Sequence, residues 1–501
     1  MSLFNNVFYG FSVSFEPYNL LACFLGVFIG TLIGVLPGIG PTATMSLLLP
    51  ITFRMSPTSS IILMCGVFYG AMYGGSTTSI LVNIPGEASS VVTCLDGHAM
   101  ARKGRAGPAL GISAFGSFIA GTMGVIGLML VAPPLAEMGL RFGPPEIFGV
   151  LLLGFTMITY LARGSALKAV IMGIVGFVLA TVGIDQMSGR PRLTYGSITL
   201  SDGIGLVPVA MGVFGVAEVL LNIEQVVKAE IYETKIKGLF PTKQDWKDSV
   251  GAIGRGGVLG FFLGILPGLG AIVPTFISYA LEKRLSRHPE RFGTGEIVGV
   301  AGPESANNAA TAGSMIPLLT LGIPPNTVLA VLLGVFLIHG VPPGPQLMEQ
   351  HPEIFWGVIT SMYMGNTMLL ILNLPLIGLW VKLLRVPYRI LFPMILLFCL
   401  IGVYSVANNI WDIVIMVIFG VIGYFMKKLE YEPAPLILAL VLGRMAEESL
   451  RQSLVLSRGS FRVFIDRPIS RGALILALIL ILSSLLAPSL KRILRRSGPE
   501  S

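Results

Sequence analysis

Long apolar stretches recur along nearly the whole chain and are separated by short polar turns. In the first half they lie at 18–36, 41–53, 58–82, 107–133, 146–162, 166–184 and 203–224. In the second half they lie at 256–266, 271–281, 296–322, 326–342, 354–384, 388–405, 409–426, 433–443 and 472–488. A membrane span needs about 20 mostly apolar residues, and in lipid the backbone must satisfy its own hydrogen bonds. The pattern therefore predicts an all-α integral membrane protein with about 12 membrane helical segments.

The composition supports this prediction and adds a detail. Of the 501 residues, 53% are hydrophobic and 12% are charged, whereas soluble domains carry about 25% charged residues. The chain also contains 61 Gly and 33 Pro, which is many for a helical protein. Membrane helices tolerate Gly and Pro breaks where the freed backbone lines a cavity, so we expect interrupted helices. Glycines that only mediate helix packing are the alternative.

Charges are concentrated in a few loops. The polar stretch 227–255 carries five lysines and an arginine, and the tail after 490 is basic, which is typical of cytoplasmic segments. The stretch 451–471 is basic too, with one apolar segment between it and the tail, so the orientation stays open. The four cysteines and four histidines are dispersed and predict no transition-metal site. No basic, aromatic-interleaved surface indicates nucleic-acid binding.

Four short motifs recur in the same order in the second half, which indicates an internal duplication. They are 34–40 with 264–270, 84–85 with 323–324, 145–148 with 352–355, and 214–216 with 419–421. The offset changes from 264 − 34 = 230 to 352 − 145 = 207, so the first copy carries an insertion whose polar part is 86–107. We divide the chain into a first repeat (1–226), a linking loop (227–255), a second repeat (256–445) and a C-terminal part (446–501) with one extra helix. The repeats are inverted if each crosses the membrane an odd number of times.

The duplicated Leu-Pro-Gly-x-Gly motifs, at 36–40 and 266–270, predict paired breaks in membrane helices. Proline removes an amide donor and glycine permits positive φ. Basic residues flank the second motif on both sides, which favours a re-entrant hairpin of two pieces of about ten residues. The helix after each break would present free N–H groups to an anion. A simple proline kink is the alternative reading.

Two polar clusters follow the breaks within apolar surroundings. The first, at 74–86, holds hydroxyls and an asparagine before Ile84-Pro85, and the second, at 302–327, holds Asn307 and Asn308 side by side. Hydroxyls and freed carbonyls suit Na⁺, and hydroxyls also donate to carboxylates. The alternative is that each hydroxyl bonds a carbonyl of its own helix. Glu304 is the acid of the second cluster and suggests a proton or cation role, whereas Glu87 and Asp96 in the insertion are expected to be solvated.

These motifs together resemble the large membrane subunit of tripartite tricarboxylate transporters, the TctA family, over roughly residues 15–445. The resemblance implies a multi-pass permease of the bacterial inner membrane that imports citrate-like di- and tricarboxylates. It implies two partners, a small four-helix membrane subunit (TctB-like) and a periplasmic solute-binding protein (TctC-like). It also implies secondary active transport by symport with Na⁺, or with H⁺, and no cofactor.

The candidate site residues come from the breaks and the polar clusters. For the substrate we select Pro41, Thr42, Ser76, Thr77, Thr78, Asn83, Asn307, Asn308, Ser314, Asn326 and Thr327. For the coupling cation we select Gly38, Gly40, Ser79, Pro85, Gly268, Gly270, Glu304 and Gly322. A channel or scaffold subunit without ion-coupled transport is the competing hypothesis. An enzyme is not expected, because the chain contains no GxSxG, HExxH or Walker sequence.

Overall fold

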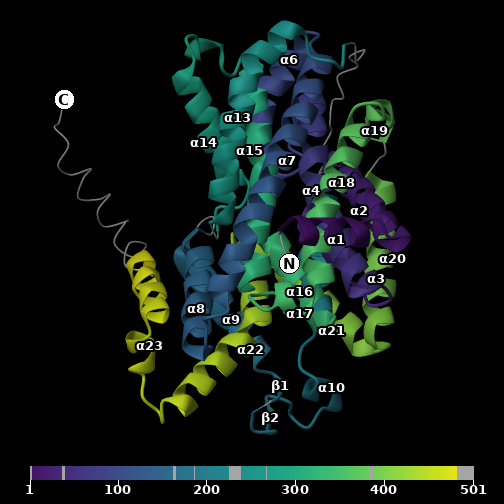
Figure 1. The fold of residues 1–501 in the computed structure, drawn as a ribbon. Helices are drawn as coiled ribbons and strands as arrows, with labels where there is room; N and C mark the ends of the chain where they lie inside the picture. The colour runs from purple at the N-terminus through teal and green to yellow at the C-terminus, as the bar shows by residue number, and fades with distance from the viewer. Residues whose placement is uncertain are drawn as a thin grey trace, which may run out of the picture. The chain divides into compact units, whose positions relative to one another are not determined.

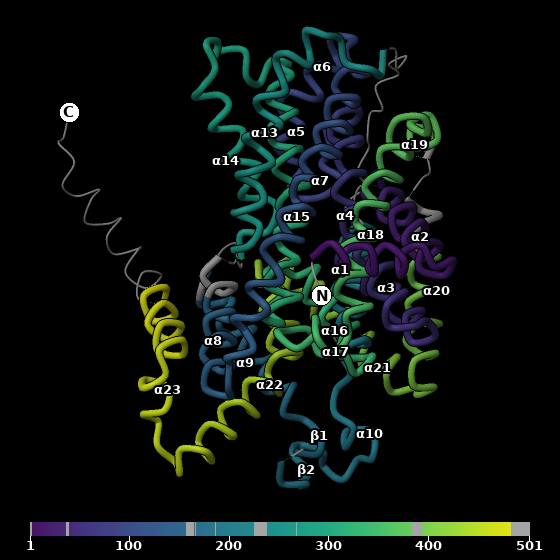
Figure 2. Tube along the Cα trace, in the orientation of Figure 1, coloured from purple at the N-terminus to yellow at the C-terminus, as the bar shows by residue number. Residues whose placement is uncertain are grey.

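The computed structural model describes residues 3–36, 40–161, 165–185, 187–224, 238–266, 268–383 and 388–481 (Figures 1 and 2). Within these ranges the chain is almost entirely helical, and the strands are the short antiparallel pair β1 (Gly183–Ile184) and β2 (Pro191–Arg192). The chain forms two compact units. Unit 1 contains residues 1–140 and 207–424, and unit 2 contains 141–206 and 425–501.

The part of unit 1 from the first repeat begins with four helices and ends with three short ones. The helices are α1 (Leu3–Ser14), α2 (Pro17–Val35), α3 (Pro41–Thr52), α4 (Pro57–Val82), η1 (Ala88–Ser90), α5 (Val91–Thr93), η2 (Cys94–His98), α6 (Ala99–Arg102), α7 (Ala106–Gly139), α11 (Leu206–Ala210), η3 (Met211–Val216) and α12 (Ala217–Glu224). Several begin at proline, which suits the first helical position because its missing N–H would be unpaired there.

The second half of the chain contributes most of the other helices of unit 1. They are α13 (Lys243–Ile265), α14 (Ile272–Leu285), η4 (Pro289–Arg291), α15 (Val298–Leu321), α16 (Thr327–Ile338), α17 (Leu347–Gln350), α18 (Pro352–Asn373), α19 (Ile377–Leu383), α20 (Tyr388–Ala407) and most of α21 (Ile410–Lys428). Unit 2 contains α8 (Pro144–Leu161), α9 (Ala166–Ala180), β1, β2, α10 (Ile198–Ser201), α22 (Pro433–Leu456) and α23 (Val463–Asp466), with further helix at 468–481.

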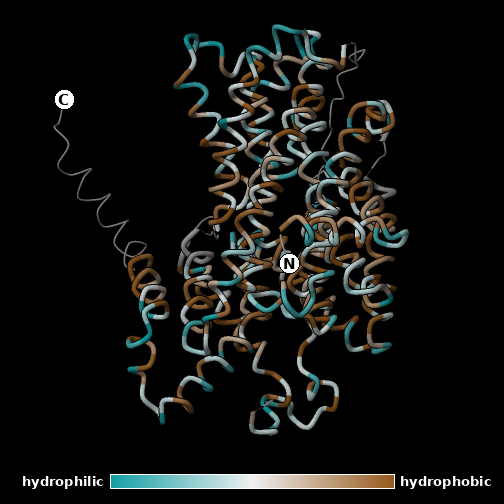
Figure 3. Tube along the Cα trace, viewed as in Figure 1, coloured by the Kyte–Doolittle hydropathy of each residue, from teal (hydrophilic) through white to brown (hydrophobic). Residues whose placement is uncertain are grey.

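The all-α membrane prediction is confirmed for the described residues. Five helical segments are long and apolar enough to cross a bilayer, and shorter apolar helices accompany them. They are Pro17–Val35, Ala106–Gly139, Leu206–Glu224, Pro352–Asn373 and Ile410–Lys428. Figure 3 shows apolar residues along most helices and hydrophilic ones in the loop after α14. Many apolar side chains of α9 and α20 are exposed, as expected for helices that face lipid.

Some element boundaries differ from the sequence expectation. Helix α13 begins at Lys243, within the stretch expected as a linking loop, because Thr242 and Asp245 form a capping box that starts the helix there. The piece before the second break is therefore 23 residues long rather than about ten. Helix α22 likewise continues to Leu456, beyond the expected end at 443. The end of the first repeat and part of the linking loop (225–237), and the end of the last apolar segment with the basic tail, lie outside the described residues.

The repeated motifs of unit 1 have matching backbone packing. Helix α2 packs against α4, and α13 packs against α15. On α2, a Cβ added at Gly26, Gly30 or Gly34 would overlap the carbonyl oxygen of Leu63, Val67 or Ala71, respectively. On α13, a Cβ at Gly256, Gly260 or Gly264 would overlap the carbonyl oxygen of Gly302, Ala306 or Ala310, respectively.

These contacts keep the offsets of the sequence repeat. The glycines differ by 256 − 26 = 230 positions and their carbonyl partners by 302 − 63 = 239, as the Leu-Pro-Gly-x-Gly and Ile-Pro motifs do. Glycines four residues apart share one helix face and allow the two backbones to approach closely. Each break is therefore preceded by a helix held tightly against the long helix that follows the break.

Candidate functional site

The first break lies against the end of α4. Helix α2 ends at Val35 and α3 begins at Pro41, and the residues between them that include Gly38 lie outside the described part. Thr78 Oγ1 donates a hydrogen bond of 2.6 Å to the carbonyl of Val35. A Cβ at Gly86 would overlap the carbonyl oxygen of Gly34. Residues 34–35 at the end of α2 thus pack against residues 78–86, and α3 begins after Gly40 with Pro41 and Thr42.

The second break lies against the end of α15 in the same way. Gly268 and Gly270 both have left-handed backbone (φ 88° and 54°), which glycine adopts without strain. The amide of Gly268 donates to the carbonyl of Pro325 at 2.8 Å. Helix α15 ends at Gly322, also left-handed (φ 71°), and α16 starts with Asn326 and Thr327. The side chain of Asn326 accepts the amide of Leu329 at 3.0 Å and so caps α16.

The long helices α4 and α15 end alike. Asn83 closes α4 with φ 59°, as Gly322 closes α15, and Ile-Pro follows in both places. Asn83 is exposed and Pro85 is half-buried. Each break thus contacts the end of the long helix that follows it: residues 34–35 contact Thr78 and Gly86, and Gly268 contacts Pro325.

The hydroxyl groups of α4 and α15 bond mainly to their own helices. Ser76 Oγ donates to the carbonyl of Tyr73, Ser79 Oγ to that of Gly75 and Ser314 Oγ to that of Thr311. Thr77 is buried in α4. Thr78 differs, because its hydroxyl crosses to the first break. Ser76 and Ser314 therefore follow the alternative expectation, in which each hydroxyl bonds a carbonyl of its own helix.

Both acids of the insertion after the first cluster are buried, so the expectation that Glu87 and Asp96 are solvated is wrong. Glu87 is 8% exposed and Asp96 is fully buried. Asp96 accepts hydrogen bonds from the amides of Gly293, Gly295 and Glu296 and from the hydroxyl of Tyr279. It thereby satisfies the backbone donors that precede α15, and these hydrogen bonds account for its burial. The insertion of the first repeat is thus part of the core around the second-repeat helix α15.

A buried polar cluster joins this insertion to α15. Ser89 Oγ lies 2.8 Å from Asn307 Oδ1 and 2.5 Å from Glu87 Oε2. One turn along both segments, the hydroxyl of Thr93 donates to the carboxyl of Glu304. Asn307 and Glu304 were expected at a site, whereas Glu87, Ser89 and Thr93 were missed. The signal that could have found them is the run Ala-Ser-Ser-Val-Val-Thr at 88–93, which carries no charge and does not resemble a solvated loop.

Asn308 lies on a different side of α15 from Asn307. Its amide donates to Ser117 Oγ of α7 at 2.7 Å. Beside it is a cavity of about 20 Å³, also lined by Tyr69, Tyr73 and Asn366, which has room for about one water molecule. The two neighbouring asparagines therefore do not share one site in this conformation.

Helices α13 and α14 form a hairpin around the second break, with pieces of 23 and 14 residues rather than about ten each. Arg255 of α13 makes a bidentate ion pair with Glu282 of α14, with N–O distances of 2.8 and 2.6 Å. The two residues lie 11 and 12 positions from the ends of the motif 266–270, so the helices run back along each other. The Glu282 side chain is 2% exposed, and the guanidinium balances its charge.

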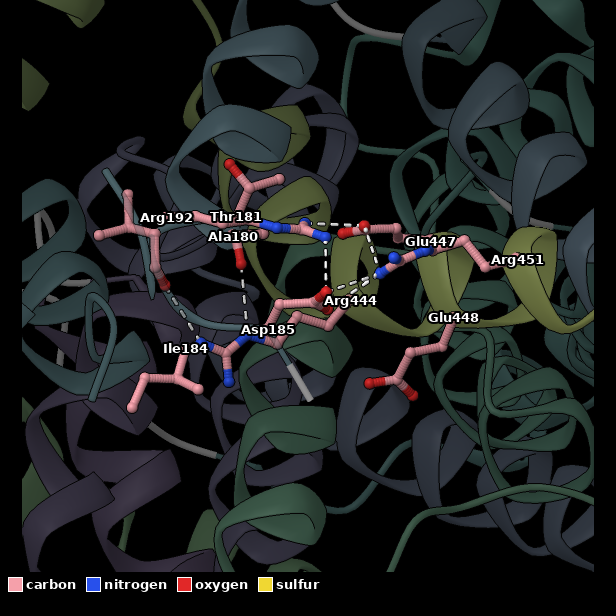
Figure 4. Close-up of a pocket in the computed structure, with 10 residues that line it drawn as sticks. Ala180, Thr181, Ile184, Asp185, Arg192, Arg444, Glu447, Glu448 and Arg451 are labelled. Atoms are coloured by element: carbon pink, nitrogen blue, oxygen red, sulfur yellow. Dashed lines mark hydrogen bonds and ion pairs between the residues drawn. The ribbon is translucent and has the colours of Figure 1, made fainter. Parts of the chain in front are cut away.

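Unit 2 has its own cluster of charges around the β1–β2 hairpin (Figure 4). Asp185 pairs with Arg192 at 3.0 Å and with Arg451 of α22 at 2.9 Å, and Glu447 bonds Arg192 at 2.8 Å. The hydroxyl of Ser188 and then these guanidinium groups hold the pKa of Asp185 well below its usual range. The cavity among them is about 20 Å³, so the cluster mainly fastens the hairpin to α22.

Comparison with known proteins places the chain in a family. The family model described as "Tripartite tricarboxylate transporter TctA family" matches residues 20–438. An uncharacterized 52.8 kDa protein in the TAR-I ttuC' 3' region of Agrobacterium vitis is 50% identical over 491 residues, 98% of each chain. An uncharacterized protein in the TAR-II ttuC' 3' region of the same organism is 50% identical over 232 residues, 46% of this chain and 96% of its own length. No solved structure matches the chain. Since the matched residues include both pairs of helix breaks, this multi-pass membrane protein belongs to the tripartite tricarboxylate transporter TctA family.

Proposed function

We propose that the chain is the large permease subunit of a secondary transporter that imports di- or tricarboxylates with a Na⁺ or H⁺ gradient. The observation that carries the proposal is the pair of matched breaks in unit 1, each packed against the end of a long helix. Duplicated halves with interrupted helices are the usual construction of secondary transporter sites. A channel or scaffold would not need two such breaks with similar partners.

The substrate carboxylates would bind at the helix starts beside the breaks. The first turns of α3 and α16 carry backbone N–H groups without a partner inside the helix, which favour negative charge. Thr42 and Thr327 add hydroxyl donors at these positions. No Lys or Arg occurs within 74–86 or 302–327. A bound cation would therefore be needed to balance the substrate charge, which gives a physical reason for coupled transport.

The coupling cation would take oxygen ligands from the breaks. Left-handed glycines and prolines leave carbonyls free of helical hydrogen bonds, and such carbonyls suit Na⁺. The candidates at the breaks are Pro85, Gly268, Gly270 and Gly322. Gly40 and Ser79 are weaker candidates, because the Gly40 carbonyl accepts the amide and hydroxyl of Thr44 and the Ser79 hydroxyl bonds Gly75 and Ser90. Glu304 would serve a separate cation site, because it lies about 27 Å before Gly322 along α15. The small four-helix subunit and the periplasmic solute-binding protein are the proposed partners, and the bacterial inner membrane is the proposed location.

Uptake into proteoliposomes tests this function. The chain is reconstituted with both proposed partners, and uptake of labelled citrate or another carboxylate is followed with Na⁺ present or replaced by choline at fixed pH, with and without a proton gradient. Uptake should require one of the two gradients. The Thr42→Val variant should lose uptake, whereas Thr367→Val should not, because Thr367 is exposed and its hydroxyl bonds the carbonyl of Tyr363 in its own helix. Uptake without either gradient would contradict the proposal and favour a channel.

A further inference from the structure

Two buried carboxyl groups of unit 1 have no basic partner. Glu87 is 8% and Glu304 is 1% exposed, and within the described part of the chain neither makes an ion pair. Ser89 contacts both Glu87 and Asn307. Thr93, one turn further along, bonds Glu304, which lies one turn before Asn307 on α15, so the two carboxyl groups belong to one cluster. Two ionised carboxyl groups buried in this cluster would each lose their hydration and would also repel each other. The arrangement therefore requires positive charge from outside the protein's own side chains.

Glu87 Oε2 accepts the amide of Ser89 at 2.5 Å, and the side-chain contacts beside it lack one proton. The single hydroxyl proton of Ser89 faces two acceptors, Glu87 Oε2 at 2.5 Å and Asn307 Oδ1 at 2.8 Å. Turning the Asn307 amide over would satisfy Ser89, but would place the amide oxygen against the Met72 carbonyl and Glu87 Oε1, at 3.5 and 3.4 Å. Either orientation leaves two acceptors facing each other. A proton on Glu87, or a metal cation beside it, resolves the conflict.

Glu304 supplies a second, independent observation. Its Oε1 accepts the hydroxyl of Thr93, but its Oε2 is buried without a hydrogen-bond partner. The hydroxyl of Ser113 on α7 faces the same carboxyl group and is also without a partner by hydrogen-bond geometry. Buried polar atoms are nearly always satisfied in native proteins. The Ser113 hydroxyl can donate to Glu304 Oε2 or, by rotating, offer its oxygen to a small cation between the two groups.

Among the described residues, no Lys or Arg pairs with either carboxyl group; Arg102 and Lys103 at the end of α6 are exposed, and His98 of η2 contacts the carbonyl of Ile80. Tyr73 of α4 and Cys94 of η2 interact with the pair, and both are neutral in their ordinary form. Other charged groups on the packed elements have partners of their own. They are Arg255 with Glu282 from α13 and α14, Asp96 with the amides before α15, and Arg105 with Asp245 at the start of α7 and α13.

From this geometry we infer that Glu87 and Glu304, with Ser89, Thr93, Ser113 and Asn307, form a two-carboxyl site for a small monovalent cation, H⁺ or Na⁺. Binding adds one positive charge to the pair, and release returns it to solution, so no other reactant is needed. The site spans the insertion of the first repeat and α15 of the second, whereas the proposed substrate groups lie at the breaks. The inference rests on the proposed function for its role in coupling.

Binding measurements on the purified chain in lipid nanodiscs test the site without transport. At neutral pH and without Na⁺, infrared spectroscopy detects protonated carboxyl groups, and calorimetric titration with NaCl detects Na⁺ binding. The variants are Glu87→Gln and Glu304→Gln, and the matched control is Glu353→Gln, because Glu353 is 39% exposed. If the cation is H⁺, a protonated-carboxyl band should be present and should decrease in both site variants. If it is Na⁺, both variants should weaken Na⁺ binding by at least about tenfold.

Two outcomes would overturn the inference. One is a wild-type protein that shows neither a protonated-carboxyl band nor Na⁺ binding, and the other is a signal that the site variants leave unchanged. Thermal unfolding of the variants against Glu353→Gln separates loss of the site from loss of the fold. Carboxylate uptake is measured separately, so a chain that binds the cation but imports no carboxylate would refute the proposed function and leave the site standing.

Discussion

The glycine contacts between α13 and α15 predict a large effect from one added methyl group. In Gly260→Ala the new Cβ would overlap the carbonyl oxygen of Ala306 and lie 2.7 Å from its Cα. Carbon atoms in contact are normally about 3.5–4.0 Å apart, so the helices would have to separate by about 1 Å. Overpacking of this kind lowers the free energy of unfolding by about 1–3 kcal/mol. We expect a value at the upper end of that range, because the clash is between two helix backbones that cannot easily move apart.

The helix propensity of alanine offsets part of that cost. Replacing glycine by alanine inside a helix gains about 0.5–1 kcal/mol, which leaves a net loss of about 2 kcal/mol. Gly254→Ala is the matched control on the same helix, because nothing lies within 4 Å of its added Cβ. That variant should be as stable as the wild type or slightly more stable. The two variants should therefore differ by about 3 kcal/mol, the sum of the loss at one site and the gain at the other.

The assay is unfolding in mixed detergent micelles followed by circular dichroism. Gly30→Ala serves as the first-repeat counterpart, since its Cβ would lie 2.5 Å from the Val67 carbonyl oxygen. It should lose as much stability as Gly260→Ala. If Gly260→Ala unfolds at the same detergent composition as Gly254→Ala, the close packing carries no energetic weight and the reasoning is refuted. Sensitivity at one of the two repeats alone would show that their packing is not equivalent.

Three further predictions concern charges and a helix end. Asp185→Asn should lower the thermal unfolding midpoint at pH 7. Because folding lowers the pKa of Asp185, its carboxylate stabilises the fold fully above the unfolded pKa of about 3.9, and this stabilisation is lost as the pH falls from there through the folded pKa. The variant and the wild type should therefore differ less at pH 3. An equal difference at both pH values would exclude the Arg451 pair as its source. Arg255→Gln should cost about 1–2 kcal/mol in the micelle assay, because it leaves the buried Glu282 without its ion-pair partner; the effect is moderate because the arginine is 45% exposed. Adding Glu282→Gln should recover most of this loss. No recovery would show that the loss comes from packing and not from charge. Asn83→Ala should cost about 1–2 kcal/mol of stability because φ at this position is 59°, a left-handed conformation that alanine adopts with strain, whereas Asn83→Gly should be tolerated. Both variants should lose uptake. Uptake retained in Asn83→Gly would show that Asn83 acts only as a helix cap.

The helix breaks could be predicted from sequence because their causes are local. Proline and glycine act on the backbone at their own positions, so Gly268, Gly270 and Gly322 are found where the motifs place them. The duplication supplied a second, independent instance of each motif. The long helices follow from apolar length in the same way.

The buried cluster could not be predicted because its causes are distant in sequence. Asp96 is buried by amides about 200 positions later, and Glu87 by Asn307, 220 positions later. Nothing in the composition of 86–107 identifies those partners. Asn307 and Asn308 show the opposite problem, since adjacent residues of a helix point about 100° apart and reach different neighbours. Their being neighbours in the sequence therefore did not mean that their side chains lie in one site.

Unit 2 is built from two stretches that lie far apart in the chain, and this has a consequence for biosynthesis. Its helices α8 and α9 are made early, but they pack against α22, which follows about 250 residues later along the chain. Arg444 of α22 bonds the carbonyls of Ala180 and Val182 at the end of α9, so that helix end also lacks its partner until then. During synthesis these early helices must remain inserted and unassembled while most of unit 1 is translated. A chain that stops near residue 430 should therefore contain a nearly complete unit 1 and an unfolded unit 2, the kind of intermediate that membrane quality-control proteases and chaperones recognise.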